Sequence, residues 1–480
     1  MPEQENAAEK EAQRPKPPLR VRIIVVALSV VFALLIFEVF LRAVGYTYPV
    51  FYEPDGSRGY ALRPGAEGFY RREGRAYVRI NSDGLRDREH EKQKPADTFR
   101  VAVVGDSYAE AFQVEREKAF WAVLERRLAE CPALAGRKVE VINFGVSGYG
   151  TAQELITLRE KVWQYSPDAV LLAVTTNNDV LDNSRALKLT DEIPYFTLNG
   201  DALVPDNSFR ETNSFRLRNS SLNRLGRWLR EHLRFVQAIH EAQGALKSRL
   251  DAWRERRRLA REQKQEPPPA ASQTPPSTTQ PNQAAGAGTN EGMPDAEPGT
   301  ANVIYREPSD DTWREAWRVT EKLLATMNAE VRAHGASFYV VTLSNGIQVF
   351  PEASAREAFA HRLGVADLFY PERRFKALGE REGFPVYNLA PDLQLFADQH
   401  KVFLHGTGAQ QGNGHWNEEG HRVAGELLAG HLCDWLVRDN ELRTAAATRK
   451  EVYSDETLQA FDETLQAFDA RARGAPRAVR

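Results

Sequence analysis

The sequence predicts an α/β fold built on a parallel β-sheet, and two observations carry this prediction. Short apolar runs rich in β-branched residues occur at 99–105, 139–143 and 169–175, a pattern typical of strands buried on both faces. Segments with helical periodicity follow the first two runs, at 118–130 and 152–165. Strands that alternate with helices at this spacing form parallel sheets that helices cover on both faces.

The first strand leads directly into Gly105-Asp106-Ser107, at the edge where open α/β sheets place their ligands. A serine at this turn can project its hydroxyl into a crevice. In an ordinary strand-to-helix turn, by contrast, Asp106 or Ser107 would serve only as a helix cap. Three later segments favour the first interpretation: Asn143 to Tyr149 after the second strand, an expected loop of Asn177, Asn178 and Asp179 after the third, and His415-Trp416-Asn417 near the end of the chain.

A serine, a glycine, an asparagine and a late histidine in this order resemble the SGNH (GDSL-type) hydrolase superfamily. The resemblance spans about residues 99–438. It is closest to bacterial members with one amino-terminal membrane segment and a segment like 79–87 before the serine. It implies a three-layer α/β/α flavodoxin-like domain in which Ser107, Gly148, Asn178 and His415 are the catalytic residues. It implies no metal and no other cofactor.

The chemistry of these residue types agrees with that implication. A serine hydroxyl needs a base to accept its proton during attack, and His415 is the candidate. The backbone N–H groups of Ser107 and Gly148 and the side-chain amide of Asn178 would stabilise the developing oxyanion. The alternative for Gly148 and Asn178 is that they are ordinary turn residues.

The segment before His415 departs from the family pattern. Related sequences carry an aspartate two or three residues before the histidine, where this chain has Gly412 and Asn413. The amide of Asn413 could orient the histidine ring, but it carries no charge. Asp392 and Asp398 are candidate substitutes. The departure leaves open a dyad helped by another group, a slow enzyme and a pseudoenzyme.

His421 is expected to pack near the site rather than to act as the base. A zinc site formed by His405, His415 and His421 is conceivable by residue count, but their spacing matches no common ligand motif.

Residues 23–41 are apolar except for Ser29 and Glu38 and are about long enough to span a bilayer. No Ala-x-Ala cleavage site follows, which favours an uncleaved anchor over a signal peptide. Five basic residues precede the span (Lys10, Arg14, Lys16, Arg20 and Arg22), and only Arg42 and Arg58 lie in the twenty residues after it. The positive-inside rule therefore places residues 1–22 in the cytoplasm and the large domain, in a bacterium, in the periplasm, anchored to the inner membrane.

The two cysteines are expected to lie on helices that cover the same face of the sheet. Cys131 continues the apolar face of the helix after Ser107, and Cys433 lies in the last helix, expected to run from about 417 to 437. The alternatives are a structural disulfide and two buried free thiols.

The remaining chain divides by composition. Residues 46–98 are expected to form a strand-and-loop region that makes one wall of the cleft. An insertion at 219–308 interrupts the catalytic domain (99–438). It contains an amphipathic helix at 222–261 and a disordered tract at 266–300. The helix is expected to lie on a membrane surface, to pair with another helix or to face solvent. The α/β pattern resumes with a helix from Ser309 to Gly335 and strands at 338–343 and 384–389. Residues 439–480 form a tail that carries a seven-residue duplication.

Together these features predict a membrane-anchored serine esterase that acts through a Ser107 acyl-enzyme. Its expected substrate is an O-acetyl group on a cell-envelope or exported polysaccharide. An O-acetyltransferase acting on the same glycans and a catalytically degenerate carbohydrate-binding protein are the alternatives. The near-balanced charge of −3 gives no reason to expect nucleic acid as a partner; the expected partners are membrane lipid and the acylated glycan.

Overall fold

The computed structural model describes residues 18–47, 49–71, 73–244, 246–247, 250 and 302–452, with side chains as far as residue 438 apart from that of residue 409. The predicted cytoplasmic tail before residue 18, the basic end of the 222–261 helix, the tract at 266–300 and the duplicated heptads after residue 452 lie outside these residues.

The core of the molecule is a five-stranded parallel sheet, as predicted. Its strands are β5 (Thr98–Gly105), β6 (Lys138–Asn143), β7 (Ala169–Thr175), β10 (Ser337–Leu343) and β11 (Val386–Asn388), in the spatial order β11-β10-β7-β5-β6. Counted along the chain this is the order 2-1-3-4-5, which is that of flavodoxin-like folds. The carboxyl ends of the strands therefore meet at one edge, where β5 lies between β7 and β6.

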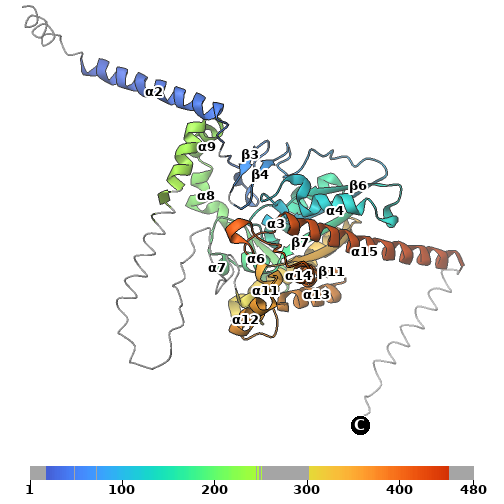
Figure 1. Ribbon diagram of the computed structural model, residues 1–480. Coiled ribbons are helices and arrows are strands. Elements are labelled where there is room, and N and C mark those ends of the chain that lie inside the picture. The colour runs from blue at the N-terminus through green and yellow to red at the C-terminus, as the bar shows by residue number, and fades with distance from the viewer. Residues whose placement is uncertain are drawn as a thin grey trace, which may run out of the picture.

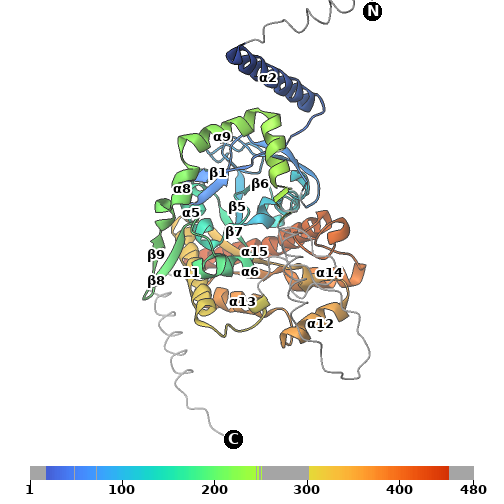
Figure 2. The same ribbon diagram turned by 90° about the vertical axis from the view of Figure 1, so that its left-hand side faces the viewer.

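Helices cover both faces of the sheet and give a three-layer α/β/α arrangement (Figures 1 and 2). Along β5, Val101 and Val103 join one buried cluster, while Ala102 and Val104 join the other. The first cluster includes α4 (Phe120–Leu128), α14 (Leu389–His400) and α15 (Glu418–Val452), and the second includes α5 (Thr151–Glu160), α11 (Asp311–Ala333), α12 (Ala353–Leu363) and α13 (Tyr370–Glu382). Burial on both faces explains why the strands read as continuous apolar runs.

Two elements beside the sheet differ from prediction. The segment that carries Asn178 is a helix, α6 (Thr176–Asp182), rather than a loop. A short helix, α3 (Ser107–Glu110), precedes α4, which begins at Phe120 rather than near residue 118. In both places tertiary contacts order polar segments that lack helical periodicity.

The last helix is longer than expected. It continues to Val452 and so crosses the predicted domain boundary at 438. The predicted helix at 152–165 consists of α5 and a 3₁₀ turn. The 3₁₀ helices are 116–118, 132–134, 162–165, 208–211, 302–305, 346–349 and 408–410.

The region before the sheet consists of two antiparallel hairpins. The strands are β1 (Tyr52–Asp55) with β2 (Gly59–Leu62), and β3 (Glu67–Tyr70) with β4 (Ala76–Arg79). Apolar side chains of both hairpins, among them Leu62 and Val78, form a third buried cluster with Phe112 and Tyr149. The predicted strand-and-loop region thus packs against loops at the carboxyl edge of the sheet.

The segment after α6 contains α7 (Arg185–Lys188), the hairpin β8 (Tyr195–Asn199) with β9 (Ala202–Asp206), α8 (Asn213–Arg218) and α9 (Ser221–His232). The long helix expected from residue 222 is interrupted at Leu233, whose backbone is extended, and helix resumes over 234–244. Figure 2 shows α9 between α2 and the catalytic domain.

The amino-terminal helix α2 (Leu19–Ala43) is apolar and long enough to cross a membrane, as an anchor or a signal sequence would be. It projects away from the rest of the molecule in Figure 1. Its side chains are exposed except near its carboxyl end, where Glu38 and Leu41 are buried.

Cys131 and Cys433 form a disulfide, which confirms the first of the two alternatives from the sequence. The bond joins the end of α4 to α15 across 302 residues of sequence. It therefore ties the end of α4 to its neighbour α15 within one helix layer.

We expect Cys131→Ser to lower the free energy of unfolding by about 2–5 kcal/mol, because the bond restricts the unfolded chain. Urea unfolding of the detergent-solubilised protein, followed by tryptophan fluorescence, measures this. Cys433→Ser and the double variant should give the same loss, since all three remove one bond. Additive losses, or none, would contradict this account.

Candidate functional site

Ser107 lies at the carboxyl end of β5, at the amino terminus of α3. Asp106 caps this helix: its Oδ1 accepts a hydrogen bond from the Tyr108 backbone N–H at 3.0 Å. Ser107 is 8% exposed. Its hydroxyl is thus held on the edge where the loops after β5, β6 and β7 converge.

His415 lies opposite Ser107, with its Nε2 2.7 Å from the Ser107 Oγ. The two residues are 308 positions apart in sequence. His415 belongs to the loop before α15, next to Trp416, which is fully buried and forms a β-bridge with His405. The structure thus brings together the serine and the histidine that the sequence singled out.

The other ring nitrogen of His415 contacts a residue that the sequence analysis did not identify. Nδ1 lies 2.5 Å from Glu73 Oε2. Glu73 comes from the loop that joins β3 to β4, in the region before the catalytic domain. With Nδ1–H donating to the carboxylate, Nε2 is left to accept the serine proton. Ser107, His415 and Glu73 therefore form a continuous hydrogen-bonded chain.

The local sequence explains how the β3–β4 loop reaches the site. Gly74 has a φ of +79°, and a Cβ there would lie 2.4 Å from the carbonyl oxygen of Gln113. The loop thus packs directly on backbone that follows α3, and only glycine allows this approach. On the other side Glu73 contacts Gly414, whose missing Cβ would lie 3.4 Å from Glu73 Oε2.

The contact between Glu73 and His415 shifts the pKa of both side chains. Burial by itself would lower the pKa of His415, but the hydrogen bond and charge of Glu73, with smaller effects of Asp106 and Glu110, raise it above its usual value. Burial opposes ionisation of Glu73 as well, yet His415 brings its pKa below the usual value. The carboxylate stays ionised and stabilises the imidazolium that forms when His415 accepts a proton.

The residues proposed from sequence to orient His415 do not do so. Glu73 occupies Nδ1, and Asn413 instead donates its backbone N–H to Gln410. Asp392 accepts a hydrogen bond from Tyr387, and Asp398 pairs with Arg356. The hypothesis for Asn413 is wrong because a carboxylate from a distant hairpin reaches the ring, so the loop before His415 needs no acid of its own.

A second histidine, His405, fixes the loop that carries His415. Its Nδ1–H donates to the carbonyl oxygen of Gly414 at 2.7 Å, and its Nε2 accepts from the Ser344 hydroxyl at 2.9 Å. Trp416 Nε1 donates to the same hydroxyl at 2.9 Å. Burial lowers the pKa of His405 to about 4, so the ring is neutral and holds this pattern at physiological pH.

The candidate oxyanion donors lie at the same sheet edge: Ser107 at the start of α3, Gly148 in the turn after β6, and Asn178 on α6. Among the described residues, the backbone N–H groups of Ser107 and Gly148 have no hydrogen-bond acceptor. Gly148 has a φ of +75°, and a Cβ would lie 2.7 Å from the Tyr60 hydroxyl oxygen. Tyr60 donates to the carbonyl oxygen of Ser147 at 2.8 Å, which holds this loop in place.

The amide of Asn178 is oriented by Asp106. Asn178 Nδ2 donates to Asp106 Oδ2 at 3.0 Å, while Asp106 Oδ1 accepts from the Thr175 hydroxyl at 3.0 Å. An amide nitrogen carries two hydrogens, so one of them can still reach a substrate oxygen. Asp106 therefore links the turn that carries Ser107 to α6.

A buried glutamate supports the loop that carries Gly148. Glu110 Oε1 accepts from the backbone N–H of Ser147 at 3.1 Å, and Tyr52 donates its hydroxyl to the same carboxyl at 2.9 Å. Burial raises the pKa of Glu110 to about 7, partly offset by these hydrogen bonds and by the charge of Arg86. Arg86, in the 79–87 segment, is itself fully buried. Arg86 of that segment thus offsets the negative charge of Glu110 below the site.

Two more buried carboxyl groups lie on α6 and α5. Asp179 accepts from the Thr151 hydroxyl and the Thr175 backbone N–H. Glu154 is fully buried, and neither of its oxygens has a hydrogen-bond donor among the described residues. Burial and the neighbouring Asp179 raise the pKa of Glu154 well above its usual value, and burial and Asp106 raise the pKa of Asp179 in the same direction. The environment of this pair therefore opposes an additional negative charge beside Asp106.

Metal binding has no support in the described part of the chain, where no three histidine, cysteine or acidic side chains converge. His421, the third member of the conceivable zinc set, accepts the Phe120 backbone N–H through Nδ1 at 3.3 Å. Burial lowers the pKa of His421 to about 3, so it packs as a neutral ring.

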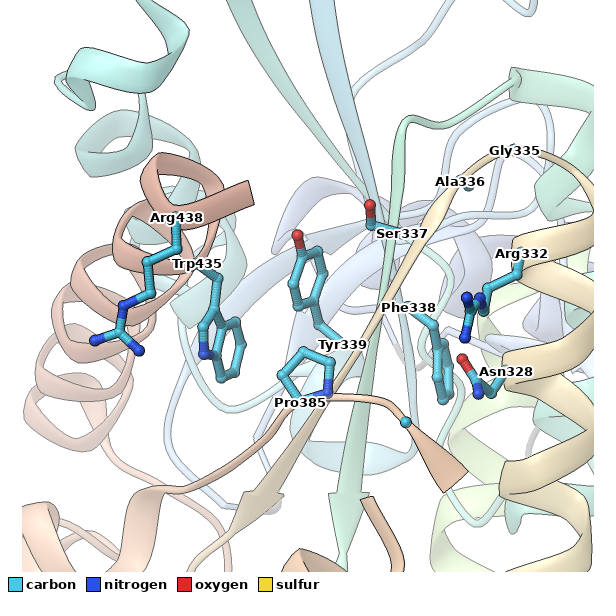
Figure 3. Close-up of a pocket in the computed structure, with 11 residues that line it drawn as sticks. Asn328, Arg332, Gly335, Ala336, Ser337, Phe338, Tyr339, Pro385, Trp435 and Arg438 are labelled. Carbon is cyan, nitrogen blue, oxygen red and sulfur yellow. The ribbon is translucent and has the colours of Figure 1, made fainter. Parts of the chain in front are cut away.

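A groove of about 450 Å³ lies at the opposite edge of the sheet, at the amino end of β10 (Figure 3). Arg332 and Arg438 lie on either side of it, with Tyr339 and Trp435 between them. Because the strands are parallel, this groove lies at the other end of the sheet from Ser107 and shares no residue with the candidate site.

No protein-family model matches the sequence, and no curated protein is similar to it. Solved structures that resemble the chain include LAE5, an α/β hydrolase enzyme from the metagenome of Lake Arreo, Spain (TM-score 0.31, 13% identity, 70% of this chain and 95% of that chain). The acetyl xylan esterase AlAXEase (0.31, 10%, 69% and 99%) and the lipase/acylhydrolase from Enterococcus faecalis (0.30, 11%, 70% and 96%) are others. Similarities at this level assign neither a family nor an activity.

We expect Glu73→Gln to reduce kcat for a simple ester by up to about 10⁴-fold, the loss known for the equivalent change in a serine protease. It should also change the pH profile. Neutral His415 is the active form, so kcat/KM falls as pH drops through its raised pKa. Loss of the carboxylate lowers that pKa and moves the acid limb to lower pH.

Glu67→Gln is the matched control, because Glu67 lies on the same hairpin and pairs with Arg79 instead. An unchanged acid limb in Glu73→Gln would mean that Glu73 does not act on His415.

We expect Asn178→Ala to lower kcat by about 10²–10³-fold with little change in KM, because an oxyanion donor acts mainly in the transition state. Steady-state kinetics measure the split, and an unchanged melting temperature excludes misfolding. A rise in KM alone would assign Asn178 to ground-state binding.

Proposed function

We propose that this chain is a membrane-anchored serine esterase of the SGNH (GDSL-type) superfamily. The observation that carries the proposal is the hydrogen-bonded chain from Ser107 Oγ through His415 to Glu73, at the carboxyl edge of a flavodoxin-like sheet. A nucleophile, a base and a carboxylate that orients the base are the parts that acyl transfer requires.

In the acylation step, His415 Nε2 accepts the proton of Ser107 as Oγ attacks the carbonyl carbon of the ester. Negative charge then moves to the carbonyl oxygen, where the N–H groups of Ser107 and Gly148 and the amide of Asn178 would donate. His415 returns the proton to the leaving alcohol, the carbon–oxygen bond breaks, and an acyl-Ser107 ester remains.

Deacylation uses the same groups in reverse. His415 accepts a proton from water, the resulting hydroxide attacks the acyl carbon, and Ser107 leaves with the proton that His415 supplies. Throughout, Glu73 keeps Nδ1–H directed at its carboxylate, so that Nε2 is the nitrogen that exchanges protons.

The Glu73 contact favours a catalytic protein over a degenerate binding protein. The absence of an aspartate before His415 was the main reason to consider loss of activity. Glu73 supplies a carboxylate with a geometry that the local sequence lacks. The raised pKa of His415 is the expected electrostatic effect of such a partner.

For the substrate we propose an O-acetyl group on a cell-envelope or exported polysaccharide, as the family resemblance implies. The position of Tyr60 supports a small acyl group, because its hydroxyl oxygen lies 2.7 Å from the place where a Gly148 Cβ would be. Bulk beside this oxyanion donor limits the room for a long acyl chain.

For the location we propose the bacterial inner membrane, with α2 as the anchor and the catalytic domain in the periplasm. The excess of basic residues before the span supports this orientation. The disulfide between Cys131 and Cys433 supports an oxidising compartment for the domain.

The test is reaction of the full chain with a fluorophosphonate, followed by intact mass. We expect one adduct, absent from Ser107→Ala, and release of acetate from O-acetylated polysaccharide by the same protein. A membrane-impermeant fluorophosphonate should label the chain in intact spheroplasts if the domain lies outside the inner membrane.

If no adduct forms while a known serine hydrolase in the same tube reacts, the esterase proposal fails. Acetyl transfer to an added glycan without acetate release would identify a transferase instead. Labelling of spheroplasts only after lysis would contradict the proposed orientation.

A further inference from the structure

The two helical segments of the insertion carry an apolar surface that the catalytic domain does not cover. None of the residues of α9 is buried. Its large apolar side chains Leu222, Leu225 and Trp228 are 83%, 54% and 52% exposed. Beyond the break at Leu233, Ile239, Leu246 and Leu250 are exposed as well. We call these six side chains the apolar face of the insertion.

Helix geometry places most of the α9 part of this face away from the catalytic domain. Glu231 faces the domain, because its carboxylate lies 3.5 Å from Arg63, next to β2. At about 3.6 residues per turn, Leu222, Leu225 and Trp228 lie about 180°, 120° and 60° around the helix from Glu231, so the two leucines point away from the domain and Trp228 lies at the border. Ile239, Leu246 and Leu250 are separated by seven and four residues, which is the spacing of one side of a helix.

Polar contacts fix the junction of the two segments to the carboxyl end of α2. Arg42 donates to Glu38 at 2.7 Å and to the carbonyl oxygen of His232 at 2.8 Å. The other carboxylate oxygen of Glu38 accepts the backbone N–H of Phe235 at 3.0 Å. Glu38 and Arg42 thus cap both helix ends at the break, and Tyr46 donates to Glu241 farther along.

This junction lies where α2 would leave the bilayer. The apolar span ends at residue 41, so Glu38 and Arg42 occupy the last turns, at headgroup depth. The facing ends of both helical segments are therefore placed at the membrane surface. Figures 1 and 2 agree on the placement of α9 beside the end of α2.

The charge of the insertion complements an anionic lipid surface. Between residues 213 and 244 there are six arginines (Arg216, Arg218, Arg224, Arg227, Arg230 and Arg234) and two glutamates. Among the described residues, Arg224, Arg227 and Arg230 form no ion pair. Apolar residues on one side of a helix, arginines on its polar side and a tryptophan at the border are typical of helices that lie in the membrane interface.

We propose that α9 and the helix over 234–244 lie in the plane of the bilayer, with the apolar face of the insertion in the headgroup region of an anionic membrane. The inference rests on the proposed anchoring by α2. Its consequence is that the catalytic domain is held against the membrane in one orientation rather than tethered loosely, so that the side with β1 and β2 lies nearest the lipid.

The experiment uses the full chain in vesicles. Both native cysteines are in the disulfide, so Leu225→Cys adds a single free thiol for the environment-sensitive dye NBD. In vesicles with phosphatidylglycerol, we expect a blue-shifted emission and loss of most of the fluorescence when a lipid-attached spin label is present. Leu395→Cys is the matched control: Leu395 is 56% exposed, on α14 of the catalytic domain, and its dye should not be quenched.

A dye at Leu35→Cys, within α2, separates this inference from the anchor proposal. Quenching at Leu35→Cys without quenching at Leu225→Cys would overturn the inference and leave the anchor intact. No quenching at either position would overturn both. A blue shift at Leu225→Cys that rises with protein concentration and is insensitive to the lipid quencher would identify a protein partner and also overturn the inference.

Charge is tested by replacing Arg224, Arg227 and Arg230 with glutamine in the Leu225→Cys background. We expect weaker quenching in phosphatidylglycerol vesicles and no further loss in phosphatidylcholine vesicles, because the arginines act through anionic lipid. Equal quenching in both vesicle types, with and without the arginines, would overturn the part of the inference that assigns the surface to anionic lipid.

Discussion

The hydrogen bond between Glu73 and His415 joins parts of the chain that are 342 residues apart in sequence. It couples the β3–β4 hairpin, which precedes the sheet, to the last loop of the α/β domain. His405 fixes the loop that carries His415, and Glu73 fixes the tautomer of the His415 ring. The turn after β5 places Ser107 within hydrogen-bond distance of the same ring. Loss of any one of these contacts would leave a histidine near a serine without the geometry for proton transfer.

Several buried ionisable groups surround the hydrogen-bonded residues Ser107, His415 and Glu73. Each of these groups is tolerated for a distinct reason. Arg86 offsets the charge of Glu110 beneath the loop of Gly148. Burial and acidic neighbours raise the pKa of Glu154 well above its usual value. His405 is kept neutral by burial, and so it works as a fixed hydrogen-bonding part of the loop. Charge is thus retained at Glu73, where the proposed chemistry needs it to stabilise the imidazolium, and reduced at the groups around it.

The same region that supplies Glu73 also contacts the insertion. The β1–β2 hairpin contacts the site through Tyr52 and Tyr60, and Arg63, just after it, pairs with Glu231 of α9. Helix α9 in turn is held by the end of α2. A continuous set of contacts therefore runs from the apolar helix through the insertion and the hairpins to the site. If α2 anchors the chain, the distance of Ser107 from the bilayer is fixed by packing rather than by a flexible linker.

The sequence by itself determined the sheet, its flanking helices and the identity of Ser107 and His415 as partners. The strands buried on both faces leave continuous apolar runs, and the polar residues at their carboxyl ends must meet at one edge in a parallel sheet. The expected position of the two cysteines followed from the same topology. Such features are predictable because they depend on local periodicity and on the rules of strand connection.

Only the tertiary structure decided that Glu73, and not Asn413, orients His415. Glu73 lies in a polar loop with no periodic pattern, and any of several carboxylates before the catalytic domain could have filled the role. The one local signal is Gly74, but a glycine after an acid has many uses. Side chains from separate hairpins meet through packing of the whole domain, and so the partner of a catalytic base can be anywhere in the chain. The break of the insertion helix at Leu233 has the same origin, because it is set by contacts with Glu38 and Arg42, whereas the apolar periodicity continues through it.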